Sequence, residues 1–194
     1  MFFRNLISKS RIRFIMKRMN ARNIPFALCP NIYALDLQKL QKAGIRFLLS
    51  DLDNTLLPYG ASEPDQRAIA FKAELDKMGI RLIICSNGFG KRVRRFASLL
   101  GVEAAGFMRK PFSGPLKRFL KQKGIAKEEV LFIGDQIQTD VRAGNGAGLR
   151  TILTEPLDPS YEPIWTKLNR IFDRKKRKAI YDSHLAKPME EINL

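Results

Sequence analysis

Four aspartates follow apolar runs of this sequence and could act together in one site. Asp51 and Asp53 come directly after one run, and Asp135 and Asp140 come after another. Carboxylates so close together repel each other in a low-dielectric crevice, unless a cation neutralises them or one of them is protonated. The sequence offers no histidine or cysteine at the spacing of metal ligands, and oxygen ligands with water suit Mg²⁺ better than zinc. We therefore expect a magnesium site among these aspartates.

A phosphate group fits the polar residues that remain. Ser86 and the backbone amides after it, again at the end of an apolar run, could donate hydrogen bonds to phosphoryl oxygens. Lys110 would supply a compensating positive charge, and Pro111 restrains the backbone at this lysine. A magnesium ion would bridge a carboxylate and a phosphoryl oxygen. These residue types predict chemistry on a phosphate ester.

Strands that alternate with helices must position these side chains. Strands are expected at residues 45–50, 80–85, 130–133 and 150–153. Helices are expected at residues 64–78, 91–100 and 114–123. This alternation implies parallel strands joined by right-handed crossovers. The predicted fold is a three-layer, doubly wound α/β sheet, whose ligands bind beyond the carboxyl ends of the strands.

The first of these helices has clear end signals, and the segments around it are short. Pro64 suits the first helical position, with Ser62 and Asp65 as a capping pair, and Gly79 ends the run. The segment between Thr55 and the strand at residues 80–85 has room for one helix and short connections only, and so does the segment between Asn87 and Lys110. A small domain needs roughly 50 residues or more. We therefore expect a capless fold, with a site open to bulky substrates.

The charge balance points to a polyanionic partner. The chain has 35 Lys+Arg and 19 Asp+Glu, for a net charge of +16. Such an excess fits an anionic membrane surface or a nucleic acid, whereas a solvated basic surface without a specific partner is the alternative. Four basic residues of the helix at 91–100 are expected near the site, where they could meet phospholipid phosphates: Lys91, Arg92, Arg94 and Arg95. No apolar run reaches the ~18 residues that a spanning helix needs.

Both ends of the chain are basic and differ from the centre. Residues 1–24 form a basic arm, which could lie on anionic lipid, act as a transit peptide, pack on the domain or be disordered. Residues 25–178 are expected to form the catalytic domain, and residues 179–194 a tail. Near the end of that domain an apolar stripe has helical spacing and precedes a basic cluster: Ile164, Trp165, Leu168, Ile171 and Phe172. We expect this stripe to dock on the sheet, in preference to lying on a membrane.

Four motifs in order resemble those of the haloacid dehalogenase (HAD) superfamily. They are Asp51-Leu-Asp-Asn-Thr-Leu56, Ser86-Asn87, Lys110-Pro111 and Gly134-Asp-Gln-x-x-Thr-Asp140. The resemblance implies that Asp51 attacks phosphorus and becomes an aspartyl-phosphate, and that Asp53 serves as acid and then as base. It also implies that Ser86, Asn87 and Lys110 bind the phosphoryl group. The implied magnesium ligands are Asp51, the backbone carbonyl of Asp53, and Asp135, with Asp140 and Thr55 in the surrounding shell.

A narrower resemblance covers about residues 25–175. The same motifs, with Cys-Pro-Asn31 before them and Lys-Leu-Asn-Arg170 after them, are similar to the YqeG-like phosphatases of HAD subfamily IIIA. That group includes phosphatidylglycerophosphate phosphatases. The resemblance implies a magnesium-dependent phosphatase whose leading substrate is this anionic phospholipid. It also implies a cytoplasmic enzyme held peripherally at the membrane, or a mitochondrial one if the basic arm is a transit peptide.

Other functions stay open at this point. The same site could hydrolyse soluble nucleotides, sugar phosphates or nucleic-acid phosphate ends, although no nucleic-acid-binding motif is visible. A non-catalytic, membrane-bound adaptor would have no need to gather repelling carboxylates. A cysteine phosphatase is disfavoured because the position six residues after Cys85 is Lys91 and not arginine. The single histidine, His184, lies in a polar tail. Cys29 and Cys85 suggest neither a disulfide nor a zinc site.

Overall fold

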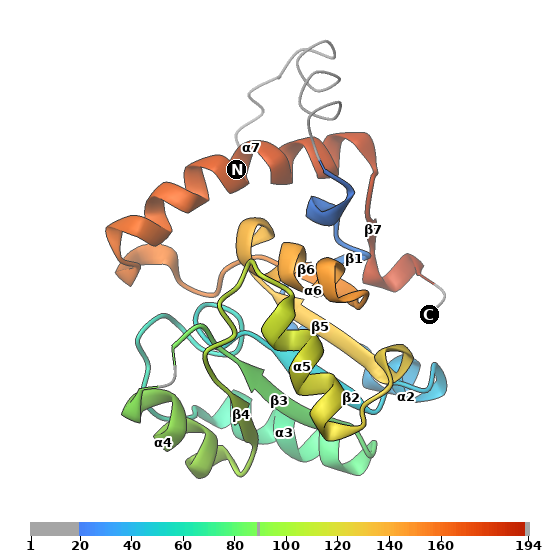
Figure 1. Cartoon of the computed structure of the whole chain (residues 1–194), viewed down its shortest axis with the longest axis vertical. Coiled ribbons are helices and arrows are strands. Elements are labelled where there is room, and N and C mark those ends of the chain that lie inside the picture. The colour runs from blue at the N-terminus through green and yellow to red at the C-terminus, as the bar shows by residue number, and fades with distance from the viewer. Residues whose placement is uncertain (1–19, 89, 193–194) are drawn as a thin grey trace.

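The computed structural model describes residues 20–192 except Phe89, and for Trp165 only the backbone (Figure 1). Residues 1–19 of the predicted basic arm lie outside this range. None of the helices in the described range is long and apolar enough to cross a bilayer.

In the part of the chain that the structure describes, seven parallel strands form a single sheet in the order β4-β3-β2-β5-β6-β1-β7. The strands are β1 (Ala27–Cys29), β2 (Phe47–Ser50), β3 (Arg81–Cys85), β4 (Glu103–Ala105), β5 (Val130–Gly134), β6 (Arg150–Thr154) and β7 (Lys187–Pro188). The four predicted strands are confirmed as β2, β3, β5 and β6. The sequence analysis missed β1, β4 and β7, which are only two or three residues long.

The register of the three central strands brings their ends together. Ser50, the last residue of β2, pairs with Ile84 on one side and with Ile133 on the other. The loops that begin after β2, β3 and β5 therefore leave the sheet at neighbouring points. The chain order also changes direction beside β2, and such a switch point is where α/β sheets bind ligands.

Helices cover both faces of the sheet, as the alternating pattern predicts (Figure 1). The helices are α2 (Leu37–Lys42), α3 (Gln66–Lys77), α4 (Lys91–Leu100), α5 (Gly114–Lys123), α6 (Arg142–Ala147) and α7 (Ile164–Ser183). A π-helical turn, η4 (Ile137–Val141), precedes α6. The short 3₁₀ turns are η1 (Ala21–Asn23), η2 (Ile32–Ala34), η3 (Lys127–Glu129), η5 (Pro159–Tyr161) and η6 (Met189–Glu191). Within the described ranges no further domain is inserted over the site, so the fold is capless.

Neighbouring residues of the central strand β2 enter two separate cores. Leu48 of β2 belongs to a cluster with side chains of α3 and α4. Its neighbour Leu49 belongs to a second cluster with side chains of α5 and α6. Because consecutive strand residues point to opposite faces, this division confirms the predicted three layers.

The start of α3 differs from the prediction. The helix begins at Gln66, and Asp65 is its N-cap, with Oδ1 accepting a hydrogen bond of 2.8 Å from the amide of Ala68. The predicted capping pair of Ser62 and Asp65, with Pro64 as the first helical residue, is therefore wrong. Asp65 has extended backbone geometry, from which its short carboxylate reaches the first-turn amides without help from Ser62.

The last helix, α7, contacts the domain with a different face from the one predicted. Asp173, Ala179 and Ile180 of α7 are buried. The four described side chains of the predicted apolar stripe are exposed, so the prediction that the stripe docks on the sheet is wrong; they are Ile164, Leu168, Ile171 and Phe172. The helix is oriented instead by charged contacts to the loop after β5, which are described below. The boundary predicted at residue 178 falls inside α7, and the strand β7 beyond it extends the sheet beside β1.

Candidate active site

A buried lysine joins two of the predicted site aspartates. The Nζ atom of Lys110 lies 2.6 Å from Asp51 Oδ1 and 2.7 Å from Asp140 Oδ1. Asp51 directly follows β2, and its amide donates a hydrogen bond to the carbonyl of Ile133 on β5. The side chain of Lys110 is only 4% exposed, so its charge acts on the two carboxylates with little screening by water.

Asp135 follows β5 and is also fully buried. Thr55 Oγ1 donates a hydrogen bond of 3.3 Å to Asp135 Oδ1. The guanidinium of Arg170, from α7, pairs with the other carboxylate oxygen of Asp135 and also with Glu162. A second arginine of α7, Arg177, donates a 2.7 Å hydrogen bond to the backbone carbonyl of Asp135. Asp135 is therefore held from two sides, by the first motif and by the last helix.

Asp140 is positioned by the π-helical turn η4 and by a glycine. Its Oδ2 atom accepts a hydrogen bond of 3.0 Å from the amide of Gln136, which closes the turn after β5. A Cβ atom at Gly134 would lie 2.4 Å from the Cβ atom of Asp140. Only glycine leaves room at this position for the carboxylate, and π-helical turns of this kind are frequent at functional sites.

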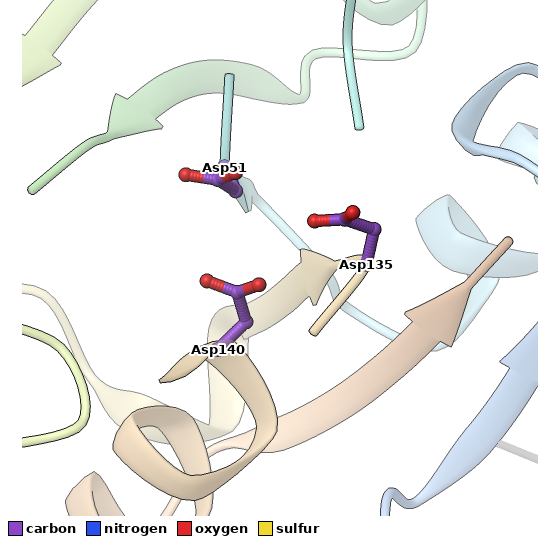
Figure 2. Close-up of side chains that lie close together, drawn as sticks. All are labelled: Asp51, Asp135 and Asp140. Atoms are coloured by element: carbon purple, nitrogen blue, oxygen red, sulfur yellow. The ribbon is translucent and has the colours of Figure 1, made fainter. Parts of the chain in front are cut away.

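Three of these carboxylates form a cluster that suits a metal ion. Ligand atoms of Asp51, Asp135 and Asp140 all lie within 4.8 Å of one another, and Figure 2 shows the three side chains facing a common space. All three groups are carboxylates, and Mg²⁺ prefers such hard oxygen ligands. The donor set therefore fits the magnesium ion that the sequence predicts. Asp140, expected in the surrounding shell, lies in the same cluster as the two predicted side-chain ligands.

The Asp53 side chain contacts helix α4 and is not part of the cluster of three carboxylates. Its Oδ2 atom pairs with Arg92 of α4 at 2.6 Å, and its Oδ1 atom accepts a hydrogen bond from the amide of Gly60. Arg92 also donates a hydrogen bond of 2.8 Å to the carbonyl of Ala61. The carboxylate of Asp53 thus lies at the rim of the site, oriented by an arginine that the sequence analysis assigned to phospholipid contacts. Arg95 likewise pairs with an acid, Glu63.

Ser86 and Asn87 follow β3 on the other side of Asp51. Ser86 is buried, and its Oγ atom accepts a hydrogen bond of 3.2 Å from the amide of Gly88. The side-chain amide of Asn87 makes a reciprocal pair with the backbone of Lys110: Oδ1 accepts from the amide at 2.6 Å, and Nδ2 donates to the carbonyl at 3.0 Å. Arg109, the residue before this lysine, has a positive φ of 46°. Asn87 therefore fixes the backbone from which Lys110 reaches into the site.

Burial and mutual repulsion shift the pKa values of the clustered groups. Burial raises the pKa of Asp51 to about 8, and the carboxylates of Asp140 and Asp135 reinforce this against the opposing effect of Lys110. Burial likewise raises the pKa of Asp135 to about 6, although Arg170 opposes it. Burial acts to lower the pKa of Lys110, but its two carboxylate partners outweigh it and the pKa is raised. Perturbed groups gathered in one crevice are typical of active sites.

The contacts from α7 were missed by the sequence analysis. Besides the two arginines, Asp173 accepts a buried hydrogen bond of 2.8 Å from the amide of Ile137 in η4. Arg170, Asp173 and Arg177 recur at helical spacing, so they form one charged face of α7. This face was the signal available in the sequence. The apolar stripe on the other side of the helix competes with this signal, because an apolar face is the one that normally packs on a domain.

The structure also bears on cysteine chemistry. Cys85 is the last residue of β3 and is fully buried. Burial raises the pKa of its thiol to about 12, so the reactive thiolate is scarce near neutral pH. A cysteine-based phosphatase mechanism is therefore disfavoured by the structure as well as by the sequence.

Comparison with known proteins finds relatives among phosphatases. A family model described as HAD-hydrolase-like matches residues 107–155, which include Lys110, Asp135 and Asp140. The chain is 32% identical over 152 residues to the probable phosphatase YqeG of Bacillus subtilis, covering 78% of this chain and 88% of that protein. It is 27% identical over 156 residues to the chloroplastic phosphatidylglycerophosphate phosphatase 1 of Chlamydomonas reinhardtii, covering 76% of this chain.

The chain spans only 58% of the length of the Chlamydomonas protein. Among solved structures, it is similar to 3-deoxy-D-manno-octulosonate 8-phosphate phosphatase from Moraxella catarrhalis, crystallised with magnesium and phosphate ions. That similarity has a TM-score of 0.48 and 20% sequence identity, and covers 63% of this chain and 74% of the other.

Proposed function

The chain belongs to the HAD superfamily of phosphatases, in the group of the Bacillus subtilis protein YqeG, and on that premise we propose a magnesium-dependent phosphomonoester hydrolase whose leading substrate is phosphatidylglycerophosphate. The observation that carries the proposal is the buried cluster of Asp51, Asp135 and Asp140 around the ammonium of Lys110. A purely structural core has no need for three buried carboxylates at the ends of parallel strands.

Asp51 is proposed as the nucleophile. Its carboxylate lies at the carboxyl end of the central strand β2, and Lys110 holds one of its oxygens at 2.6 Å. Attack of the other oxygen on phosphorus would form an aspartyl-phosphate and expel the alcohol. Lys110 favours the ionised form of Asp51, but burial outweighs this effect and raises the pKa of the carboxyl group to about 8. A bound Mg²⁺ ion would favour the ionised form further.

Asp53 is proposed as the general acid and then the general base. It lies two residues after the nucleophile, in the motif whose resemblance to the HAD superfamily implies this role. Arg92 and the amide of Gly60 orient its two oxygens. Asp53 would give its proton to the departing alcohol and then take a proton from the water that hydrolyses the aspartyl-phosphate.

Ser86, Asn87 and Lys110 are proposed to bind the phosphoryl group. The Ser86 hydroxyl and the amides that follow it can donate hydrogen bonds to phosphoryl oxygens, and Lys110 adds positive charge. Asn87 acts through its reciprocal hydrogen bonds with the backbone of this lysine. Removing Asn87 should therefore misplace the ammonium without removing it.

Asp51 and Asp135, joined by Asp140 or by the backbone carbonyl of Asp53, are the proposed magnesium ligands. Thr55 and Arg170 orient Asp135 for this role. When bound, Mg²⁺ supplies positive charge that offsets the repulsion among the carboxylates and polarises a phosphoryl oxygen.

The proposal of a lipid substrate has three supports. One relative at 27% identity is named a phosphatidylglycerophosphate phosphatase. The capless site gives access to a head group that stays attached to a bilayer. The net charge of +16 attracts an anionic membrane surface, at which a phospholipid phosphatase would act peripherally.

A direct assay compares three substrates in the presence of Mg²⁺ and of a chelator. Phosphate release is measured from phosphatidylglycerophosphate in anionic vesicles, from a soluble nucleotide and from a phosphorylated oligonucleotide. Release from the lipid that stops with chelator is the expected result. Release only from the nucleotide or the oligonucleotide would keep the aspartate mechanism and overturn the lipid substrate. Membrane binding without any hydrolysis would favour a non-catalytic adaptor.

A further inference from the structure

The helix α7 turns its charged face toward the protein and an apolar stripe toward solvent (Figure 1 shows the helix). Ile164, Leu168, Ile171 and Phe172 are 66%, 47%, 57% and 64% exposed, whereas Asp173 is 2% exposed. In a globular domain the apolar face of a helix normally packs on the core. We refer to these four apolar residues as the α7 stripe.

The contacts on the inner face keep the α7 stripe outside. Arg170 pairs with Asp135, Arg177 donates to the carbonyl of the same residue, and Asp173 accepts from the amide of Ile137. Turning the helix to bury the stripe would leave these charged groups without partners, and Asp135 would lose its ion pair with the Arg170 guanidinium. Because unpaired buried charges are costly, the outward orientation of the stripe is part of the fold.

Charge beside the stripe complements an anionic surface. Lys167, Arg174 and Lys175 are exposed on α7, and none of them forms an ion pair with an acid in the range that the structure describes. Basic residues that flank an apolar face are the pattern of helices that lie in the interface of anionic membranes. The basic residues of α4 are less available for this role, because Arg92 and Arg95 already pair with acids.

A second copy of the chain fits the stripe less well. Four side chains of at most ~200 Å² each, about half to two-thirds exposed, offer on the order of 500 Å². A stable protein interface buries roughly 800 Å² on each partner. Pairing two copies through this helix would also bring together chains that each carry a charge of +16.

We propose that the α7 stripe docks the enzyme on an anionic phospholipid bilayer, with α7 lying in the plane of the interface. The proposal deepens the proposed function and rests on its lipid substrate. An interfacial helix sinks its apolar face ~5–10 Å into the boundary between head groups and acyl chains. Since a helix is ~10 Å across, the opposite face, from which Arg170 and Arg177 contact Asp135, then lies near the level of the lipid phosphates.

The full chain provides a probe for this docking, because Trp165 is its single tryptophan and lies in α7. Emission is recorded on vesicles of phosphatidylglycerol and phosphatidylcholine, with chelator present so that no turnover occurs. We expect a blue shift, quenching by brominated lipids, and weaker binding to vesicles of phosphatidylcholine alone. The double variant Leu168→Ser/Phe172→Ser should lower the partition coefficient at least tenfold.

The matched control is Ile69→Ser/Leu99→Ser, which removes two apolar side chains that are 45% and 54% exposed on α3 and α4. These helices lie at the end of the molecule away from α7 (Figure 1). The control should bind vesicles within twofold of the unmodified chain. Circular dichroism and melting temperature confirm that both double variants fold.

Two results would overturn the proposal. One is equal vesicle binding by the stripe variant and the control, with unchanged Trp165 emission. The other is a light-scattering result in which the unmodified chain is a dimer and the stripe variant is a monomer, which would show that the stripe contacts a second copy of the chain. Hydrolysis of a water-soluble, short-chain phosphatidylglycerophosphate distinguishes a failure of membrane docking from a failure of the proposed phosphatase function. Loss of docking alone leaves its hydrolysis intact, whereas vesicle binding without hydrolysis would count against the function and not against docking.

Discussion

Replacing Lys110 by methionine tests the electrostatic design of the site. Methionine keeps an unbranched side chain of similar length but removes the charge that lies 2.6 Å from Asp51 and 2.7 Å from Asp140. Both carboxylates are then left in a buried crevice without this ammonium. We expect the metal-free protein to be strongly destabilised, and the loss to depend on whether Mg²⁺ is present.

The structure sets the expected magnitude. Removing one partner of a buried ion pair costs about 3–5 kcal/mol of unfolding free energy. For a chain of this size, such a loss lowers the melting temperature by roughly 10 °C. Lys123→Met is the matched control, because it removes an ion pair with Glu103 in which the N–O distance is also 2.7 Å. Both side chains of this control pair are nearly half exposed. An exposed pair contributes about 0–1 kcal/mol.

The assay is urea unfolding followed by circular dichroism, in chelator and in saturating Mg²⁺. Mg²⁺ should restore part of the stability of Lys110→Met, since the ion replaces the missing positive charge. The double variant Lys110→Met/Asp140→Asn should be more stable than the single variant in chelator, by about 1–3 kcal/mol, because one unpaired carboxylate is gone. If Lys110→Met lowers the free energy of unfolding by less than about 1 kcal/mol, and by no more than Lys123→Met does, Lys110 does not stabilise the buried carboxylates.

Three further predictions concern the same crevice. Calorimetry should show that the dissociation constant for Mg²⁺ falls between pH 6 and pH 8, by up to about tenfold per pH unit for each proton that the ion displaces. The reason is that the pKa values of Asp51 and Asp135 are raised to about 8 and about 6. A dissociation constant that does not change with pH would contradict these shifts. Gly134→Ala should cost about 1–3 kcal/mol in urea unfolding and weaken Mg²⁺ binding, because its Cβ atom meets Asp140 at 2.4 Å; unchanged stability and binding would show that this carboxylate moves freely. Arg170→Met should cost about 3 kcal/mol or more in chelator, because Asp135 loses its guanidinium partner; a variant as stable as the unmodified chain would count against this pair.

The central part of the fold was predictable from the sequence because its strands are apolar and their helices have clear periodicity. The expected helices at 91–100 and 114–123 match α4 and α5 in full. The short strand β4 was missed because Glu103 and the two alanines after it carry no strand pattern. β7 was missed because a strand of two residues, one of them proline, is defined by its pairing with β1 and not by its own composition.

The outward face of α7 could not be read from its apolar pattern. Hydrophobic periodicity predicts which residues share a face, but not which face contacts the domain. The charged residues Arg170 and Arg177 decide this, because Asp135 and its backbone carbonyl need donors at the end of β5. The clustering of Asp51 with Asp135 was expected from the strand ends alone, whereas the turn of Asp53 toward Arg92 depends on where α4 lies.

Asp51 is proposed to carry the phosphoryl group during turnover. This role is tested by mixing the enzyme with phosphatidylglycerophosphate and Mg²⁺, quenching with acid within the first turnover, reducing with borohydride and mapping the product by mass spectrometry. Reduction converts a phosphorylated aspartate into homoserine. We expect homoserine at position 51, and neither homoserine nor turnover in a folded Asp51→Asn variant. A phosphoryl group on Ser86 or Cys85, or substantial turnover by Asp51→Asn, would contradict it.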